Sequence, residues 1–149
     1  MKLLQRNSSK GFTLIELLVV IGILAVLLTL VLAAINPARQ FAQANNTKRR
    51  SDVNALLNAI HQYAADNKGA LPTGITTDAL DVKSAGGGAD ICTALVTTYI
   101  ASMPVDPTTG SYTDCTTYDS KYTVIKLANG RVTIAAPDAE ISESINVTR

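Results

Sequence analysis

The sequence is poor in the residue types from which catalytic and metal sites are built. It has one histidine, His61, and two cysteines, Cys92 and Cys115. Two cysteines cannot complete a tetrahedral zinc site, and His61 lies far from both of them in the sequence, on a predicted helix. The aspartates are scattered over predicted turns, so no nucleophile with a base, carboxylate pair or metal cluster is assembled. The sequence therefore predicts a protein that is not an enzyme. His61, between Ile60 and Gln62, is expected to be a helix-surface residue. A membrane-anchored enzyme that depends on His61 is the alternative.

A glycine-rich phosphate-binding loop is also absent. The run Gly86-Gly87-Gly88 has no predicted strand before it and no Lys-Ser or Lys-Thr after it. Residues 69–89 are rich in turn-forming residues, and we expect them to form a flexible loop.

One long apolar run dominates the rest of the sequence. Residues 12–35 read FTLIELLVVIGILAVLLTLVLAAI, in which Glu16 is the single charged residue. A helix of this length would be roughly 36 Å long, enough to cross a hydrocarbon core of about 30 Å. Residues 17–35 also lack the polar face that a core helix of a soluble protein would show. The run is therefore predicted to span a membrane.

The charges that precede the run predict its orientation. Lys2, Arg6 and Lys10 all lie before it, which favours a cytoplasmic N-terminus and an exported C-terminal part. An ordinary secretory signal is the alternative interpretation. Such a signal has an apolar core of only about 7–15 residues and a small-residue cleavage site after it, and residues 32–34 match such a site loosely.

Glu16 is the unusual residue of the run. A carboxylate within the membrane is costly unless it is paired or protonated, and is a functional hypothesis by default. Lys10 lies six residues away, which does not place it on the same helix face. Cleavage between Gly11 and Phe12 would create a cationic amine on Phe12, four residues before Glu16.

Residues 10–16, Lys-Gly-Phe-Thr-Leu-Ile-Glu, and the apolar run after them resemble the class III signal of type IV pilins and related pseudopilins. The resemblance covers residues 6–66. It implies that a prepilin peptidase cuts after Gly11 and methylates Phe12. It also implies that Glu16 neutralises the terminal amine of a neighbouring subunit during filament assembly.

The chain is divided accordingly into a leader at residues 1–11, a long helix at 12–67 and a globular head at 68–149. Residues 12–35 would lie first in the membrane and then in a filament core. Pro37 is expected to interrupt the helix. An amphipathic pattern follows, whose apolar positions recur at three- and four-residue spacing and whose helix ends at Lys68-Gly69: Val53, Leu56, Leu57, Ile60, Tyr63 and Ala64.

The head is predicted to contain a short helix and a small antiparallel sheet. Asp90 would cap a helix over 91–101. Alternating segments at 122–127 and 131–135 flank Asn129-Gly130, which is a strong hairpin signal. A third strand is expected near 111–117, and residues 138–149 form either a last strand or a loose tail. The fold class is therefore α+β, a long N-terminal helix packed on a small sheet.

In an exported head, Cys92 and Cys115 are expected to form a disulfide, which would stabilise the head by roughly 3 kcal/mol. The alternative is a pair of unpaired buried thiols.

Lys48-Arg49-Arg50 is the densest basic cluster. A run of three cations on a helix is typical of a solvated face or of a salt bridge between subunits, and no specific nucleic-acid partner is predicted. A DNA-uptake or adhesion module that uses these three cations is an alternative function.

Residues 103–112 resemble the Pro-x-Asp-Pro turn of major pseudopilins of type II secretion and of some short pilins. In those pseudopilins a neighbouring loop binds calcium. Asp106, Asp114 and Asp119 are weak calcium candidates here because their spacing matches no known calcium loop. No other cofactor is expected.

The sequence thus predicts a structural subunit of a type IV pilus-like filament. Copies of the subunit would assemble into a homo-oligomeric filament. Each subunit would be anchored in the bacterial cytoplasmic membrane before assembly and would be periplasmic or extracellular after it. Its partners would be the prepilin peptidase and the assembly machinery. The alternative is a major pseudopilin of a type II secretion system.

Overall fold

The computed structural model describes residues 11–149, apart from the side chain of Ala33. These residues fall into two compact units, of which the first ends at Ala38 and the second is Arg39–Arg149. Residues 1–10 of the predicted leader, with their three cations, lie outside the described residues.

The predicted helix is interrupted where the sequence placed the break. Helix α1 spans Leu14–Ala34 and helix α2 spans Pro37–Asp66. Ile35 leaves the helical conformation, with φ −91° and ψ 124°. A proline disfavours helical geometry in the residue before it, yet suits the first position of a helix because its missing N–H would have no partner there. Pro37 therefore ends one helix and begins the next.

Helix α2 has the predicted amphipathic character. Val53, Leu56, Leu57 and Ile60 are fully buried. The helix stops at the predicted Lys68-Gly69, where both residues have positive φ and the Gly69 N–H donates to the Ala64 carbonyl over 2.7 Å. This left-handed ending is the usual way in which a helix is closed at its C-terminus.

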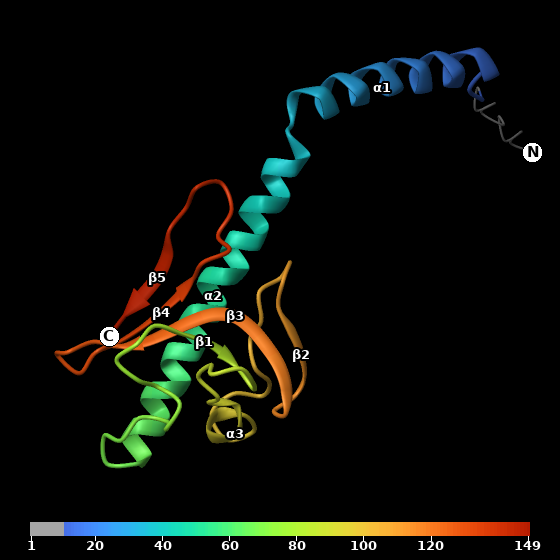
Figure 1. The fold of residues 1–149 in the computed structure, drawn as a ribbon. Helices are drawn as coiled ribbons and strands as arrows, with labels where there is room; N and C mark the ends of the chain where they lie inside the picture. Colours follow the sequence, from blue (N-terminus) through green and yellow to red (C-terminus); the bar gives the residue numbers. More distant parts are fainter. Residues whose placement is uncertain (1–10) are drawn as a thin grey trace, which may run out of the picture. The chain divides into compact units, whose positions relative to one another are not determined.

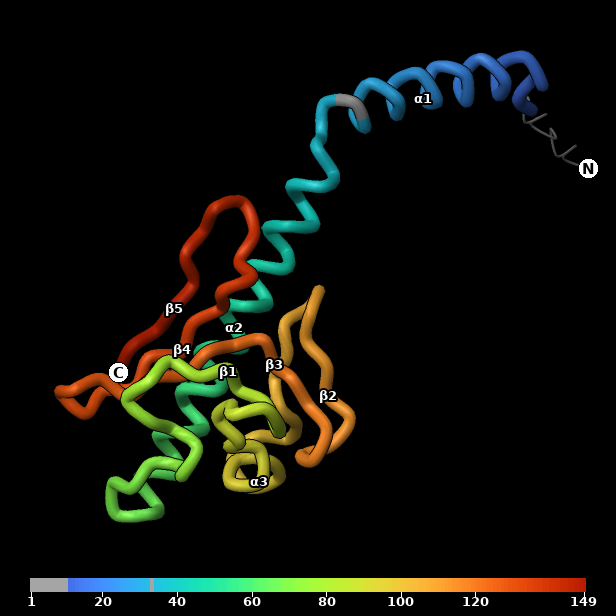
Figure 2. The backbone as a smooth tube through the Cα atoms, viewed as in Figure 1, coloured from blue at the N-terminus to red at the C-terminus, as the bar shows by residue number. Residues whose placement is uncertain are grey.

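Five strands form one sheet, which lies across α2 (Figure 1). The order is β1-β3-β4-β5, and β2 also pairs with β3; all pairings are antiparallel. The backbone trace shows β3 as the long central strand (Figure 2). The strands are β1 Leu80–Lys83, β2 Ser111–Asp114, β3 Thr117–Lys126, β4 Val132–Ala136 and β5 Ile145–Thr148.

The hairpin predicted around Asn129-Gly130 is confirmed as β3 and β4. Gly130 has φ 82°, and the Asn129 side chain accepts from the Arg131 N–H over 3.1 Å. Alternate residues of both strands are buried and share one apolar core with α2. The predicted third strand is β2, and of the two alternatives for the C-terminal segment the strand, β5, is present.

Two predictions about the head were wrong. Strand β1 lies inside residues 69–89, which were expected to be loop. Its alternation covers only Leu80 and Val82, too short a pattern to stand out beside the glycines. The last of these glycines lies against the backbone of β1. A Cβ on Gly88 would lie only 2.6 Å from the Asp81 carbonyl oxygen, so only glycine allows the two backbone segments to come this close.

The second wrong prediction concerns the short helix. Helix α3 spans only Cys92–Leu95, and its N-cap is Ile91, without a side-chain cap, in place of Asp90. The chain turns instead at Thr97, whose φ is 72° and whose N–H donates to the Ile100 carbonyl. The β-branched residues at 96–98 favour this early end because they lose side-chain freedom in a helix.

Candidate functional site

The first candidate site is the start of α1, next to the predicted cleavage bond. Gly11, Phe12 and Thr13 are exposed and precede the helix. Thr13 is the N-cap: its Oγ1 accepts from the Glu16 N–H over 3.2 Å. The Glu16 carboxylate in turn accepts from the Thr13 N–H and from the Thr13 hydroxyl, each over 2.8 Å. The two residues thus form a capping box, in which each side chain accepts a hydrogen bond from a backbone N–H of the other that has no partner within the helix.

This pairing answers a question that sequence reasoning left open. The sequence suggested no partner for Glu16 within the chain, whereas the structure places Thr13 against it. The signal was present, because Thr followed three residues later by Glu before an apolar run is the sequence pattern of a capping box.

The rest of α1 carries an uncovered apolar surface. Large apolar side chains between Phe12 and Ile35 are 46–91% exposed. Leu14–Leu32 is long and apolar enough to cross a membrane, with a mean hydropathy of 3.0. The Thr29 hydroxyl forms its hydrogen bond within the helix, because it donates to the Val26 carbonyl over 2.7 Å. Such a surface requires a cover of lipid or of other helices.

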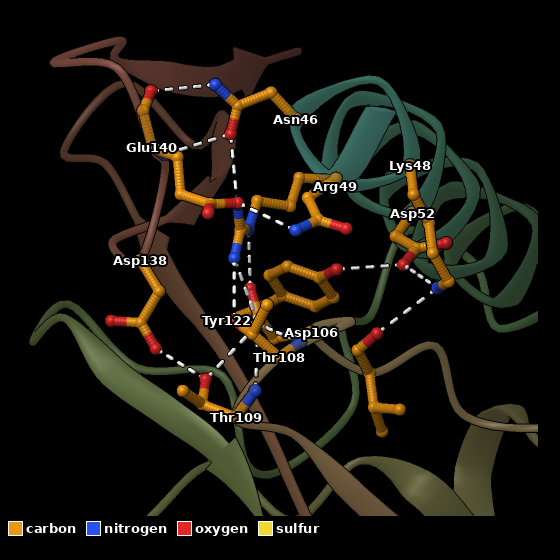
Figure 3. A network of polar contacts seen from close by, with 12 residues as sticks. Asn46, Lys48, Arg49, Asp52, Asp106, Thr108, Thr109, Tyr122, Asp138 and Glu140 are labelled. Atoms are coloured by element: carbon orange, nitrogen blue, oxygen red, sulfur yellow. Dashed lines mark hydrogen bonds and ion pairs between the residues drawn. The ribbon is translucent and has the colours of Figure 1, made fainter. Parts of the chain in front are cut away.

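The second candidate site is a buried ion cluster between α2 and two loops of the head (Figure 3). Arg49 Nε donates to Asp106 Oδ2 over 2.6 Å, and neither side chain is exposed to solvent. A second nitrogen of Arg49 lies 2.7 Å from a Glu140 carboxylate oxygen, and a third donates to the Thr108 hydroxyl over 2.9 Å. Asn46 completes the cluster: its Oδ1 accepts from Arg49, and its amide donates to the Glu140 carbonyl. The cluster binds residues 106–108 and 140 to one turn of α2.

The pKa values of the cluster follow from these contacts. The hydrogen bond to Asp106 raises the pKa of Arg49 against the effect of burial. Burial alone would raise the pKa of Asp106, but hydrogen bonds from Arg49 and from the Thr108 and Thr109 amides outweigh it and hold that pKa well below its usual range. The hydrogen bond from Arg49 likewise lowers the pKa of Glu140. All three groups are therefore charged at neutral pH.

For Arg49 alone, the buried position corrects the expectation that residues 48–50 form a solvated face or a salt bridge between subunits. Lys48 pairs with Asp52, and Arg50 pairs with Glu143. Asp52 also accepts from the Tyr122 hydroxyl over 2.8 Å. All three cations therefore form ion pairs within the head, while the side chains of Lys48 and Arg50 stay 48% and 52% exposed.

The predicted disulfide joins Cys92 to Cys115, with 5.3 Å between the two Cα atoms. It connects the first residue of α3 to the turn between β2 and β3. The alternative of two unpaired thiols is therefore wrong.

The three calcium candidates do not come together in one site. Asp106 belongs to the ion cluster, Asp114 accepts from the Thr116 and Thr117 amides, and Asp119 pairs with Lys121. Within residues 11–149, no three His, Cys, Asp or Glu side chains form a group that could hold a metal ion. Each of these aspartates instead stabilises a turn or an ion pair.

His61 lies half-buried on α2, and its Nε2 is buried without a hydrogen-bond partner among the described residues. It was expected on the helix surface. Within residues 11–149, no nucleophile or carboxylate is hydrogen-bonded to His61, so these residues assemble no catalytic group around it.

Comparison with known proteins relates this chain to a family model and to a secretion-system protein. Residues 6–32 match the family model described as the prokaryotic N-terminal methylation motif. Over 104 residues, the chain is 34% identical to the type II secretion system core protein G of Pseudomonas aeruginosa, an alignment that covers 70% of this chain and 71% of that protein. No solved structure matches the chain.

Proposed function

Since the chain belongs to the family of type IV pilins and pseudopilins and is a pilin-like filament subunit, we propose that it is cut between Gly11 and Phe12 and polymerises through α1. The observation that carries this proposal is the surface of α1, apolar on all sides and exposed along its length. Before assembly the helix anchors the subunit in the membrane. In the filament the same surface packs against the helices of other copies, so one apolar surface serves two environments in turn.

In the proposed assembly step, Glu16 sets the register between neighbouring subunits. Cleavage gives Phe12 a cationic terminal amine. The Thr13 hydroxyl and N–H hold the Glu16 carboxylate at the very start of α1, where the amine of a neighbouring copy is its natural counter-ion. A subunit docked out of register would leave both charges unpaired in a dry core, which is heavily penalised.

The orientation in the membrane is part of the same proposal. Lys2, Arg6 and Lys10 keep the leader on the cytoplasmic side, where the peptidase would cut it, and the head lies on the exported side. The disulfide between Cys92 and Cys115 is consistent with an oxidising compartment for the head.

The test is the intact mass and N-terminal residue of the chain purified from its own cells. A methylated Phe12 terminus with α1 retained is the expected result. An uncut Met1, or a terminus near Ile35, would overturn the proposal, because the first means no processing and the second means loss of the assembly helix.

A type II secretion pseudopilus is the second candidate, favoured by the identity to core protein G and by the Pro104-Val105-Asp106-Pro107 turn. Deletion of the gene distinguishes the two filaments. Loss of surface pili with normal secretion supports the pilus, whereas loss of extracellular export of folded enzymes, with surface pili unchanged, supports the pseudopilus.

A further inference from the structure

Phe41, near the start of α2, is an aromatic side chain that its own chain leaves uncovered. It is 72% exposed, whereas Ile141, the next most exposed large apolar side chain of Arg39–Arg149, is 40% exposed. One exposed apolar residue on a protein surface needs no explanation by itself. Phe41 differs from such a residue in where it lies on its helix and in how close it is, along the chain, to the apolar surface of α1.

Phe41 lies before the part of α2 that the head covers. Residues 37–41 are all exposed, and Asn46 is the first fully buried residue of the helix. Asn46 also joins α2 to the head, because its side-chain amide donates to the Glu140 carbonyl over 2.7 Å. Figure 1 shows the first turns of α2 extending past the loop between β4 and β5. The head of the same copy therefore does not bury Phe41.

The chain keeps Phe41 close to the uncovered surface of α1. That surface ends at Ile35, which is 46% exposed. Two Cα–Cα steps of about 3.8 Å lead from Ile35 to Pro37, and a helical rise of about 6 Å leads from Pro37 to Phe41. The Cα atoms of Ile35 and Phe41 are thus at most about 14 Å apart, whatever the angle at the break. Whatever covers the end of α1 in an assembly is within reach of Phe41.

The surroundings of Phe41 suit a helix of another copy better than a lipid surface. A helix that lies on a membrane surface carries Lys and Arg on its polar face, whereas residues 40–47 contain no charge. Ala38, Ala42 and Ala44 flank Phe41 with small side chains, and the distance between two packed helices depends on the size of the side chains at their contact. A second helix can therefore approach this part of α2 closely.

The proposed pairing of Glu16 with the Phe12 amine of a neighbour sets the spacing between copies. The two residues are four positions apart, so the neighbour is displaced by about 6 Å along the helix axis, toward the exported side. Each such step carries the apolar end of another α1 in the direction of Phe41. Two or three steps cover the distance of about 14 Å between Ile35 and Phe41.

We propose that Phe41 of one copy packs against the last turns of α1, residues 28–35, of a copy further along the filament. This inference rests on the proposed function as a filament subunit. The receiving segment has apolar side chains that are 46–62% exposed in the single chain: Leu28, Leu30, Val31, Leu32 and Ile35. The donor and the receiving segment are different parts of one molecule, so every copy can make the same head-to-tail contact, as an open helical assembly requires.

The first test is photo-crosslinking in filaments that contain wild-type chain and a copy with benzoylphenylalanine in place of Phe41. Crosslinked peptides are identified by mass spectrometry, and crosslinks from position 41 to residues 28–35 of a second copy are expected. The matched control carries the probe at Gln43, which is exposed and lies about 200° from Phe41 around the helix axis. Crosslinks from position 41 only to its own head or only to lipid, or equal crosslinking to residues 28–35 from both positions, would overturn the proposal.

A third probe position separates this inference from the proposed function. Benzoylphenylalanine at Val20, on α1, reports packing between the apolar helices. Crosslinked copies from Val20 without crosslinks from position 41 to residues 28–35 would overturn the Phe41 contact and leave the filament function intact. Absence of crosslinked copies from Val20 would overturn the filament function itself.

The substitution Phe41→Gln tests whether Phe41 acts between copies or within its own chain. Glutamine is at least as good a helix former as phenylalanine, so the purified full chain in detergent should melt at an unchanged or higher temperature. The amount of sheared filament should fall several-fold because the apolar contact is lost. Phe41→Leu, the matched control, keeps an apolar side chain and should retain most of the filament yield. Normal yield from Phe41→Gln, or a lower melting temperature that accounts for its loss, would overturn the proposal.

Discussion

Arg49 and Asp106 form a fully buried ion pair 57 residues apart in the sequence, with the Arg49 Nε 2.6 Å from the Asp106 Oδ2. Removing two charges from water has a large desolvation cost. The ion pair offsets this cost only if its hydrogen-bond geometry is close to ideal and if the remaining N–H donors of the guanidinium also find acceptors. Here Asn46, Thr108 and Glu140 use them. The pair therefore fixes the turn after Pro104 to α2 in a single arrangement.

Breaking this pair should destabilise the head strongly. Arg49→Met or Asp106→Ala leaves one buried charge without its partner, and the expected loss is about 3–5 kcal/mol of unfolding free energy. The double variant Arg49→Met with Asp106→Ala should lose less than the sum of the two single variants. The measurement is urea unfolding of the purified chain in detergent, followed by tyrosine fluorescence.

Arg50→Met is the matched control for that experiment. Arg50 pairs with Glu143 at the surface, with 52% of its side chain exposed, so its removal should lose no more than about 1 kcal/mol. If Arg49→Met and Arg50→Met lowered the unfolding free energy equally, the buried ion pair would contribute no more to stability than the surface pair.

The same cluster predicts how stability depends on pH. The pKa values of Asp106 and Glu140 are lower in the folded chain than in the unfolded chain, where they are about 3.9 and 4.3. The unfolded state therefore binds protons first as the pH falls. The contribution of the two carboxylates is complete above about pH 5 and is lost progressively below it.

Urea midpoints measured at pH 7, 4 and 3 test this dependence. The midpoint should fall between pH 7 and pH 3, and Asp106→Asn should flatten that fall because it removes a carboxyl whose pKa is much lower in the folded state than in the unfolded state. A fall of equal size in the Asn variant would place the acid sensitivity in other carboxylates.

The sequence predicted those parts of the fold that depend on local patterns. The apolar run, Pro37, the face of α2 and the Asn129-Gly130 hairpin each follow from residues close together in the chain, and the structure contains all of them. Strand β1 was missed because its stability comes from pairing with β3, about 40 residues later. Its own four residues carry almost no signal.

The ion cluster was missed for a similar reason. Lys48, Arg49 and Arg50 look alike in the sequence, and only the helix phase sends Arg49 toward the core with Val53 and Leu56. A buried arginine becomes favourable only once Asp106 and Glu140 arrive from distant loops. By contrast, the partner of Glu16 was local and could have been found, because Thr13 lies three residues before it.

Removal of the disulfide should weaken the head without changing its fold. The bond between Cys92 and Cys115 closes a loop with a sequence separation of 23 residues. On the chain-entropy account such a loop is worth roughly 3 kcal/mol. Cys92→Ala with Cys115→Ala should therefore lower the unfolding free energy by about that amount, measured by urea unfolding under oxidising conditions.

Reduction of the native chain provides the control for the disulfide. Wild type in excess dithiothreitol should match the double alanine variant to within about 1 kcal/mol, the difference being the buried volume of the Cys92 side chain. An unchanged unfolding free energy after complete reduction would contradict the prediction.

The capping box at the start of α1 should matter for assembly and not for insertion. Thr13→Val keeps the shape of the side chain but removes the hydroxyl that accepts from the Glu16 N–H and donates to its carboxylate. Loss of an N-cap of this type costs about 1 kcal/mol. The Glu16 carboxylate would then be less well held at the helix start, and the yield of sheared filaments should fall about five-fold, while the amount of subunit in the membrane fraction stays constant.

Two further variants separate the hydroxyl from the carboxylate. Thr13→Ser retains the hydroxyl and should assemble normally. Glu16→Ala or Glu16→Leu removes the carboxylate, so these variants should still insert, because α1 remains apolar, but should assemble more poorly than Thr13→Val. If Glu16→Leu gave normal filaments, a charge at this position would not set the register of assembly. If Thr13→Ser failed like Thr13→Val, the methyl group of threonine, and not its hydroxyl, would be the group that assembly requires.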